Sequence, residues 1–144
     1  MVRQTTPPGA AEILRTDPNA VYLDVRSEPE FEAGHPAGAY NVPLLHLDEA
    51  TGRPQPNEDF ERVVAAKLGR MTKVVVGCQS GGRSQRAAEI LASLGFRDVT
   101  NMQGGFGGAR DPSGQVTVAG WQESGLPVET QARDGRSYAE LKSA

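Results

Sequence analysis

One segment, Lys73-Val74-Val75-Val76-Gly77-Cys78, constrains the fold of this chain more than any other. Its three consecutive valines favour a β-strand, and neighbouring side chains of a strand point to opposite faces. The run therefore predicts burial on both faces, which is typical of parallel sheets covered by helices. A glycine-rich stretch follows, and apolar residues then recur at helical spacing over about 84–94. The segment thus indicates a buried strand that leads through a tight loop into a helix.

The rest of the chain repeats this alternation of strand and helix patterns. Strand patterns occur at 21–26, 40–44 and 98–102, and helix patterns at 7–14 and 58–68. Such alternation predicts an α/β fold with a mainly parallel sheet. In sheets of this kind, ligands bind at the carboxyl ends of the strands, which is where Cys78 stands.

The length of 144 residues fits a single domain. We expect residues 1–7 to be a loose lead-in, 8–128 to form the domain and 129–144 to be a polar tail, from which Tyr138 and Leu141 could dock. No apolar run approaches the roughly 20 residues of a membrane span. The first residues lack the apolar centre of a secretory signal, so a cytoplasmic location is expected.

Charge and cysteine content narrow the functional classes. The net charge of −3 argues against a nucleic-acid-binding surface, which is usually basic. The single cysteine excludes an intrachain disulfide and an internal dithiol. Two histidines far apart in sequence do not match a Cys/His zinc site. We therefore expect no metal, no cofactor, no nucleic acid and no membrane among the partners.

Several features around Cys78 favour a reactive sulfur. Gly81 and Gly82 allow the backbone to curl so that its amides point inward, and the following helix start adds partial positive charge. Arg83 supplies a cation with a planar fork for an oxyanion. Such surroundings favour thiolate over thiol, so Cys78 is the candidate nucleophile, provided that solvent reaches it. The alternative is an inert cysteine that only fills the core.

Three parts of the chain resemble the single-domain rhodaneses. The active-site loop of that family is similar to Cys78, Gln79, Ser80, Gly81, Gly82, Arg83 and Ser84. The family's N-terminal signature is similar to residues 22–26 and 31–39, and its C-terminal signature to residues 95–99, 104–106, 120–121 and 125–128. The resemblance implies a small, mainly parallel five-stranded sheet flanked by helices on both faces. Residues 107–119 have the character of an insertion into this pattern.

The resemblance also implies a function. Cys78 would take the outer sulfur of thiosulfate, carry it as a persulfide and pass it to cyanide or a thiol, which could belong to a protein. The partners implied are thus a small anionic sulfur donor and a thiol or cyanide acceptor. The amides of residues 79–84 would stabilise the persulfide anion. The enzyme class implied is a thiosulfate sulfurtransferase.

The same resemblance suggests roles for side chains outside the glycine pair. Arg83 would bind the sulfonate end of the donor. Asp24, Arg26 and His35 would support the loop, with Arg26 orienting Asp24 and His35 in a structural role. From the insertion, Arg110 could reach the pocket.

Two other functions remain open on the sequence alone. One is a non-catalytic or redox-sensing module that binds a protein partner, since a fold does not fix a function. The other is a cysteine phosphatase or arsenate reductase. Loops of those enzymes resemble Cys-x5-Arg, whereas the spacing from Cys78 to Arg83 is Cys-x4-Arg. The shorter loop makes a smaller cradle, which suits a sulfur atom better than a tetrahedral phosphate.

Overall fold

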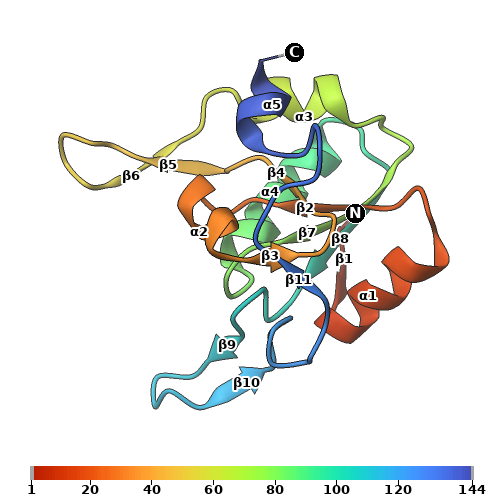
Figure 1. Cartoon of the computed structure of the whole chain (residues 1–144), viewed down its shortest axis with the longest axis vertical. Helices are drawn as coiled ribbons and strands as arrows, with labels where there is room; N and C mark the ends of the chain where they lie inside the picture. Colours follow the sequence, from red (N-terminus) through yellow and green to blue (C-terminus); the bar gives the residue numbers. More distant parts are fainter. Residues whose placement is uncertain (1, 144) are drawn as a thin grey trace.

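A five-stranded parallel sheet forms the centre of the computed structural model, which describes residues 2–143 (Figure 1). All four strand pairings in this sheet are parallel. The strands, in spatial order, are β1 (Val2–Thr5), β8 (Asp98–Met102), β7 (Lys73–Gly77), β2 (Val21–Asp24) and β4 (Tyr40–Asn41). The predicted α/β class is confirmed.

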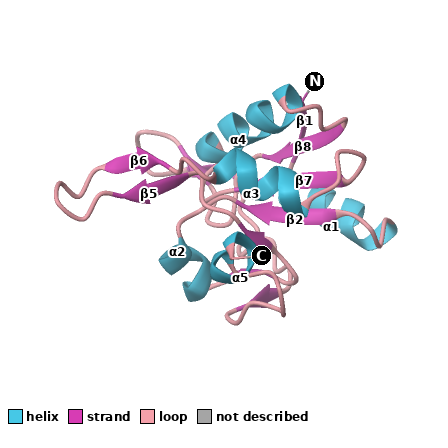
Figure 2. Ribbon diagram, turned by 90° about the horizontal axis from the view of Figure 1, so that it is seen from above, coloured by secondary structure: helices cyan, strands magenta, loops and turns pink. Residues whose placement is uncertain are grey.

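Helices cover both faces of the sheet because the central strand is apolar on both sides. Val74 and Val76 belong to one buried cluster and Val75 to another. The first cluster includes side chains from the three helices α3 (Phe60–Lys67), α4 (Gly82–Ser93) and α5 (Tyr138–Lys142). Figure 2 shows α3 and α4 lying over the strands. The second cluster includes side chains from α1 (Pro7–Thr16) and α2 (Glu28–Ala33).

The N-terminal residues differ from the loose lead-in expected over residues 1–7. Residues 2–5 form β1, which pairs with β8 at the edge of the sheet, from Val2 with Val99 to Thr5 with Met102. The sequence of β1, VRQT, has one apolar residue and two exposed positions. Backbone pairing with β8 holds this strand, and such pairing leaves no apolar pattern in the sequence. Residue 1 lies outside the described residues.

A second difference between the expected and the observed structure concerns residues 48–57. The two prolines in this segment predict a loop. Here β5 (Leu45–Leu47) and β6 (Pro54–Pro56) form an antiparallel ribbon that projects from the body of the molecule (Figure 1). Each strand of an isolated ribbon has one unpaired side, where a residue without an N–H is tolerated. Proline therefore does not exclude a strand at this place.

The insertion and the tail are also ordered into elements. Within residues 107–119, β9 (Ala109–Arg110) pairs with β10 (Val116–Val118). Farther along, β11 (Val128–Glu129) pairs with β3 (His35–Pro36). Tyr138 and Leu141 of α5 are buried, so the tail docks through the two residues that the sequence singled out.

Within residues 2–143, no helix combines the length and the apolar character needed to cross a membrane.

Candidate active site

Cys78 follows the last residue of β7 directly, at the edge where the parallel strands end. Its Sγ atom accepts a hydrogen bond from the Gly81 backbone N–H at 3.1 Å. Gly81 has φ 121°, a left-handed conformation that favours glycine, and it directly precedes α4. The loop therefore turns back on the sulfur, and at least one amide points at it, as the glycine pair suggested.

Access to the sulfur differs from the sequence expectation. Cys78 is only 2% exposed, although the prediction of a nucleophile requires a sulfur that solvent reaches. The residue continues a strand that is buried on both faces, and the loop folds over its free end. The next two residues, Gln79 and Ser80, are exposed. Substrate access in this conformation therefore has to come through the loop itself.

A glycine-rich segment, Gly104–Gly108, supports the loop from the outside. The Phe106 N–H donates to the Cys78 carbonyl at 2.7 Å, and the Gly107 N–H donates to the Gln79 carbonyl at 2.9 Å. Gly105 has φ 59°, and a Cβ atom there would lie 2.5 Å from the Cys78 carbonyl oxygen. The glycines are thus required because two backbones approach closely.

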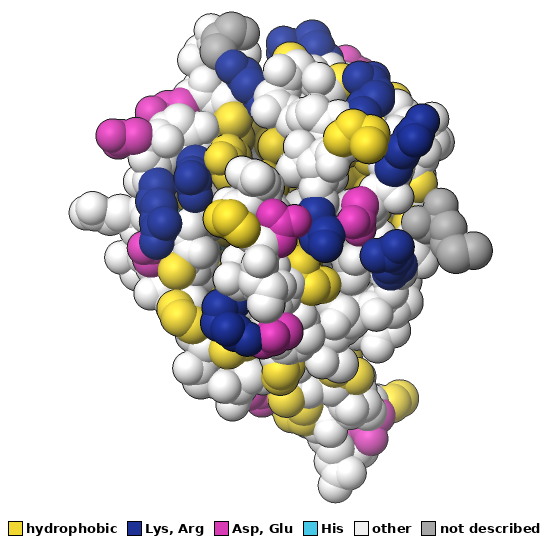
Figure 3. Space-filling view, turned by 90° about the vertical axis from the view of Figure 1, so that its right-hand side faces the viewer, with side chains coloured by type: hydrophobic (Ala, Val, Ile, Leu, Met, Phe, Trp, Pro, Cys, Tyr) yellow, Lys and Arg dark blue, Asp and Glu magenta, His cyan; other side chains and the backbone are white. Residues whose placement is uncertain are grey.

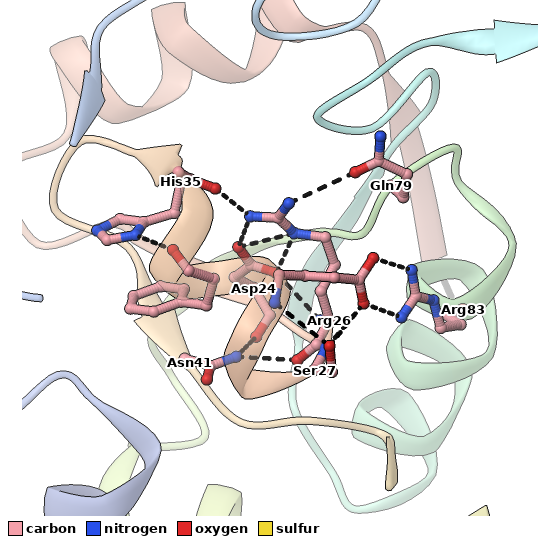
Figure 4. A network of polar contacts seen from close by, with 10 residues as sticks. Asp24, Arg26, Ser27, His35, Asn41, Gln79 and Arg83 are labelled. Atoms are coloured by element: carbon pink, nitrogen blue, oxygen red, sulfur yellow. Dashed lines mark hydrogen bonds and ion pairs between the residues drawn. The ribbon is translucent and has the colours of Figure 1, made fainter. Parts of the chain in front are cut away.

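Asp24 and Arg26 form a buried ion pair beside the loop (Figure 4). The Arg26 Nη2 atom lies 2.7 Å from Asp24 Oδ2 and also 2.7 Å from the Gly34 carbonyl oxygen. Nη1 reaches Gln79 Oε1 at 3.4 Å, and the guanidinium lies 4.5 Å from the centre of the Phe106 ring. Arg26 thus links β2, the end of α2 and the Cys78 loop, while Asp24 holds its orientation.

Arg83 is engaged by a carboxylate that the sequence did not single out. Its Nη1 and Nη2 atoms donate to the two oxygens of Glu30 at 2.7 and 3.0 Å (Figure 4). Glu30 also closes the capping box of α2 with Ser27. The hydrogen bond from Arg83 outweighs burial and lowers the pKa of Glu30 to about 2. The positive charge of Arg83, which was expected to bind the anionic sulfur donor, is therefore already offset by the Glu30 carboxylate.

The remaining predicted residues take structural positions. His35 is buried, its Nδ1 lies 2.7 Å from the Phe31 carbonyl oxygen and its ring stacks on Phe31 at 3.7 Å. The Ser84 hydroxyl donates to Asn101 Oδ1 at 2.6 Å, which ties the start of α4 to β8. The exposed Arg110 lies 3.4 Å from Glu123 Oε2.

Two residues of the site escaped the sequence analysis. Asn41 donates from Nδ2 to the carbonyl oxygens of Asp24 and Arg26, both at 3.0 Å, and so fixes the backbone under the ion pair. No local pattern marks it. Glu30 carries a signal, because it follows Ser27 by three residues in the spacing of a capping box, but its partner Arg83 lies 53 residues away.

Among the described residues, 2–143, no group of three or more His, Cys, Asp or Glu side chains is arranged to hold a metal ion.

Comparison with known proteins places this geometry in a family. The Rhodanese-like domain matches residues 7–110. Thiosulfate sulfurtransferase 16, chloroplastic, of Arabidopsis thaliana is 38% identical over 108 residues, which are 75% of this chain and 78% of the relative. Thiosulfate sulfurtransferase GlpE of Pseudomonas fluorescens is 39% identical over 100 residues, covering 69% of this chain and 78% of the relative. Three other plant relatives are matched over 51%, 64% and 52% of their length.

Among solved structures, that of Rv0390 from M. tuberculosis is similar throughout. It superposes with a TM-score of 0.74 at 30% identity and covers 91% of this chain and 98% of its own. The similarity therefore extends over most of the length of both chains.

Proposed function

Because this chain belongs to the rhodanese family, we propose that it is a sulfurtransferase that carries sulfur on Cys78. The observation that carries the proposal is the hydrogen bond from the Gly81 N–H to Cys78 Sγ at 3.1 Å, at the point where β7 gives way to α4. A backbone donor and the positive end of a helix both stabilise an anion on sulfur. An inert core cysteine needs neither of them.

In the first half of the reaction, the Cys78 thiolate attacks the outer sulfur of thiosulfate. A new S–S bond forms to Sγ, the S–S bond of thiosulfate breaks, and sulfite leaves with the bonding electron pair. Cys78 then holds a persulfide anion. In the second half, cyanide or a thiolate attacks the outer sulfur, and the Cys78 thiolate is released. The two steps predict ping-pong kinetics.

Arg83 is proposed to hold the sulfonate of the donor with the N–H groups that Glu30 leaves free. A guanidinium has five N–H donors, and Glu30 takes one from each of two nitrogens. Arg26 and Asp24 act as positioning residues. Arg26 holds Gln79 of the loop through a hydrogen bond, and Asp24 holds Arg26 through the buried ion pair.

The test is the mass of the intact protein after incubation with thiosulfate at neutral pH. We expect a gain of one sulfur atom, its loss on adding cyanide with release of thiocyanate, and no gain in Cys78→Ala. The relatives named thiosulfate sulfurtransferase support thiosulfate as the first donor to try. Absence of both the mass gain and thiocyanate from folded protein would overturn the proposal.

A non-catalytic module is the second candidate, and the burial of Cys78 favours it. A thiol that is 2% exposed reacts slowly unless the loop opens. Iodoacetamide labelling distinguishes the two functions. The enzyme predicts that incubation with thiosulfate moves the label to the outer sulfur of the persulfide, from which dithiothreitol removes it. A module with a permanently closed loop predicts slow labelling that dithiothreitol does not reverse, with or without thiosulfate.

A further inference from the structure

A cavity of about 390 Å³ lies between the β5–β6 ribbon and the loop side of α2 and α4. The ribbon contributes Leu45, His46, Leu47 and Pro54, and the opposite wall contains Glu30 and Arg83. Cavities that bind small organic ligands have volumes of about 300–1,000 Å³. A space of this size exceeds what cyanide or thiosulfate needs.

The ribbon wall of this cavity is apolar. Leu45 and Leu47 share one face of β5 because alternate residues of a strand point the same way. Leu47 stands opposite Pro54 in the pairing of the two strands, and both line the cavity. Leu47 is 67% exposed, so its side chain is accessible to a ligand in the cavity. The wall therefore suits a ligand with an apolar body.

The charged wall offers no net charge to a ligand. Glu30 and Arg83 face each other at 2.7 Å and neutralise one another. Beside this neutral pair, the apolar ribbon wall suits a ligand whose body is uncharged. His46, the polar residue that the ribbon contributes to the cavity wall, packs against the ring of Tyr138 with the ring centres 5.7 Å apart.

The cavity is next to the loop that carries the nucleophile. Arg83 follows Cys78 by five residues and lies in both the loop and the cavity wall. The ribbon projects on the side of the molecule toward which the parallel strands point (Figure 2). In a persulfide, the outer sulfur extends about 2 Å beyond Sγ. Cys78 itself does not line the cavity, so the loop has to open before a ligand held there can meet the transferable sulfur.

We propose that this cavity binds the sulfur acceptor and that the acceptor is a low-molecular-weight organic thiol with an apolar body. The inference rests on the proposed sulfurtransferase function. The acceptor thiolate attacks the outer sulfur of the Cys78 persulfide, an S–S bond forms to the acceptor, and the bond to Sγ breaks. Cys78 leaves as thiolate, and the product is the organic persulfide of the acceptor.

The experiment compares two thiols of similar acidity, phenylmethanethiol and 2-mercaptoethanol, as acceptors from the thiosulfate-loaded protein. We expect kcat/KM to be about tenfold higher for the aromatic thiol, mainly through KM, because its ring is buried against the ribbon. Leu47→Gln should reduce this preference by about three- to fivefold. Equal rates for the two thiols, or a preference unchanged in Leu47→Gln, would overturn the proposal.

Met71→Gln is the matched control. Met71 is 75% exposed in the turn before β7, at the end of the sheet where the strands begin. Figure 3 views that end, where charged and apolar side chains are interspersed. The control should keep the full preference for the aromatic thiol. Sulfur transfer to cyanide shows which proposal has failed. If the loaded protein transfers no sulfur to cyanide, the sulfurtransferase proposal itself fails. If it transfers sulfur to cyanide but shows no preference for the aromatic thiol, only the acceptor site fails.

Discussion

At the scale of single residues, the absence of a side chain at Gly77 leaves room for the Tyr22 hydroxyl beside the strand that ends before Cys78. Gly77 pairs with Asp24 across the sheet, and a Cβ atom at this position would collide with the Tyr22 hydroxyl. Tyr22 is 3% exposed, and its burial raises its pKa well above the usual value, so the phenol stays neutral. The glycine before Cys78 thus makes room for a tyrosine in the second buried cluster.

Gly77→Ala should therefore destabilise the protein by about 3 kcal/mol, since overpacking a full site forces the backbone or Tyr22 to shift. Urea unfolding followed by circular dichroism measures the change. Gly82→Ala is the control, because a Cβ atom there meets nothing within 4 Å. If the two variants are equally stable, the packing of Tyr22 against Gly77 does not constrain this site.

At the scale of elements, the Glu30–Arg83 ion pair joins α2 to the start of α4, directly after the loop that follows Cys78. Glu30 also caps α2 through Ser27, so one carboxylate holds a helix start and a neighbouring helix together. Its pKa of about 2 lies below the usual 4.5, which means that folding favours the ionised form. The stabilisation is therefore present above the pKa of the unfolded chain and is lost as the pH falls toward the folded value.

Glu30→Gln separates the charge from the cap, because glutamine also completes a capping box. We expect the variant to be less stable than the wild type by about 1 kcal/mol at neutral pH, a value reduced for the partial exposure of the pair. The difference should shrink between about pH 5 and pH 2. Urea unfolding across this range measures it.

Glu12→Gln serves as the reference for this titration, because it removes an ion pair of Glu12 with Arg15 that lies on the open surface. Exposed pairs contribute little, so its pH profile should follow the wild type. A constant stability difference between wild type and Glu30→Gln down to pH 2 would contradict the assigned role of the carboxylate.

At the scale of the whole molecule, the tail completes the core. Tyr138 and Leu141 are 3% and 5% exposed and belong to the buried cluster that contains Val74 and Val76 of β7. The Asn57 side-chain amide donates to the Tyr138 hydroxyl at 3.1 Å. The Rhodanese-like domain match ends at residue 110, so this helix lies outside the matched residues. The cooperative unit of this chain therefore extends to α5.

Leu141→Ala should lower the free energy of unfolding by about 2–4 kcal/mol, the usual cost of removing a buried leucine side chain. Ser143→Ala, at an exposed position just after α5, should change it little. Thermal and urea unfolding give both values. Equal stability of the two variants would show that α5 docks without contributing to the core.

The sequence alone determined the parallel sheet and the nature of the loop. Three valines in succession require apolar surroundings on both faces, and a glycine pair between a strand and a helix permits an inward-facing amide such as that of Gly81. These are local properties, because they depend on side-chain periodicity and on the backbone freedom of glycine. The α/β class follows from them.

Only the tertiary structure decided the pairing of distant groups. Glu30 meets Arg83, Leu47 faces the same cavity, β1 joins the sheet edge, and the end of β7 buries Cys78. These features depend on how separate elements pack or on backbone hydrogen bonds. Neither kind of contact produces a periodic pattern of side chains in the sequence. The candidate nucleophile, Cys78, was therefore visible in the sequence. Packing decided that Glu30 pairs with Arg83, that the loop buries Cys78 and that a cavity lies beside the loop.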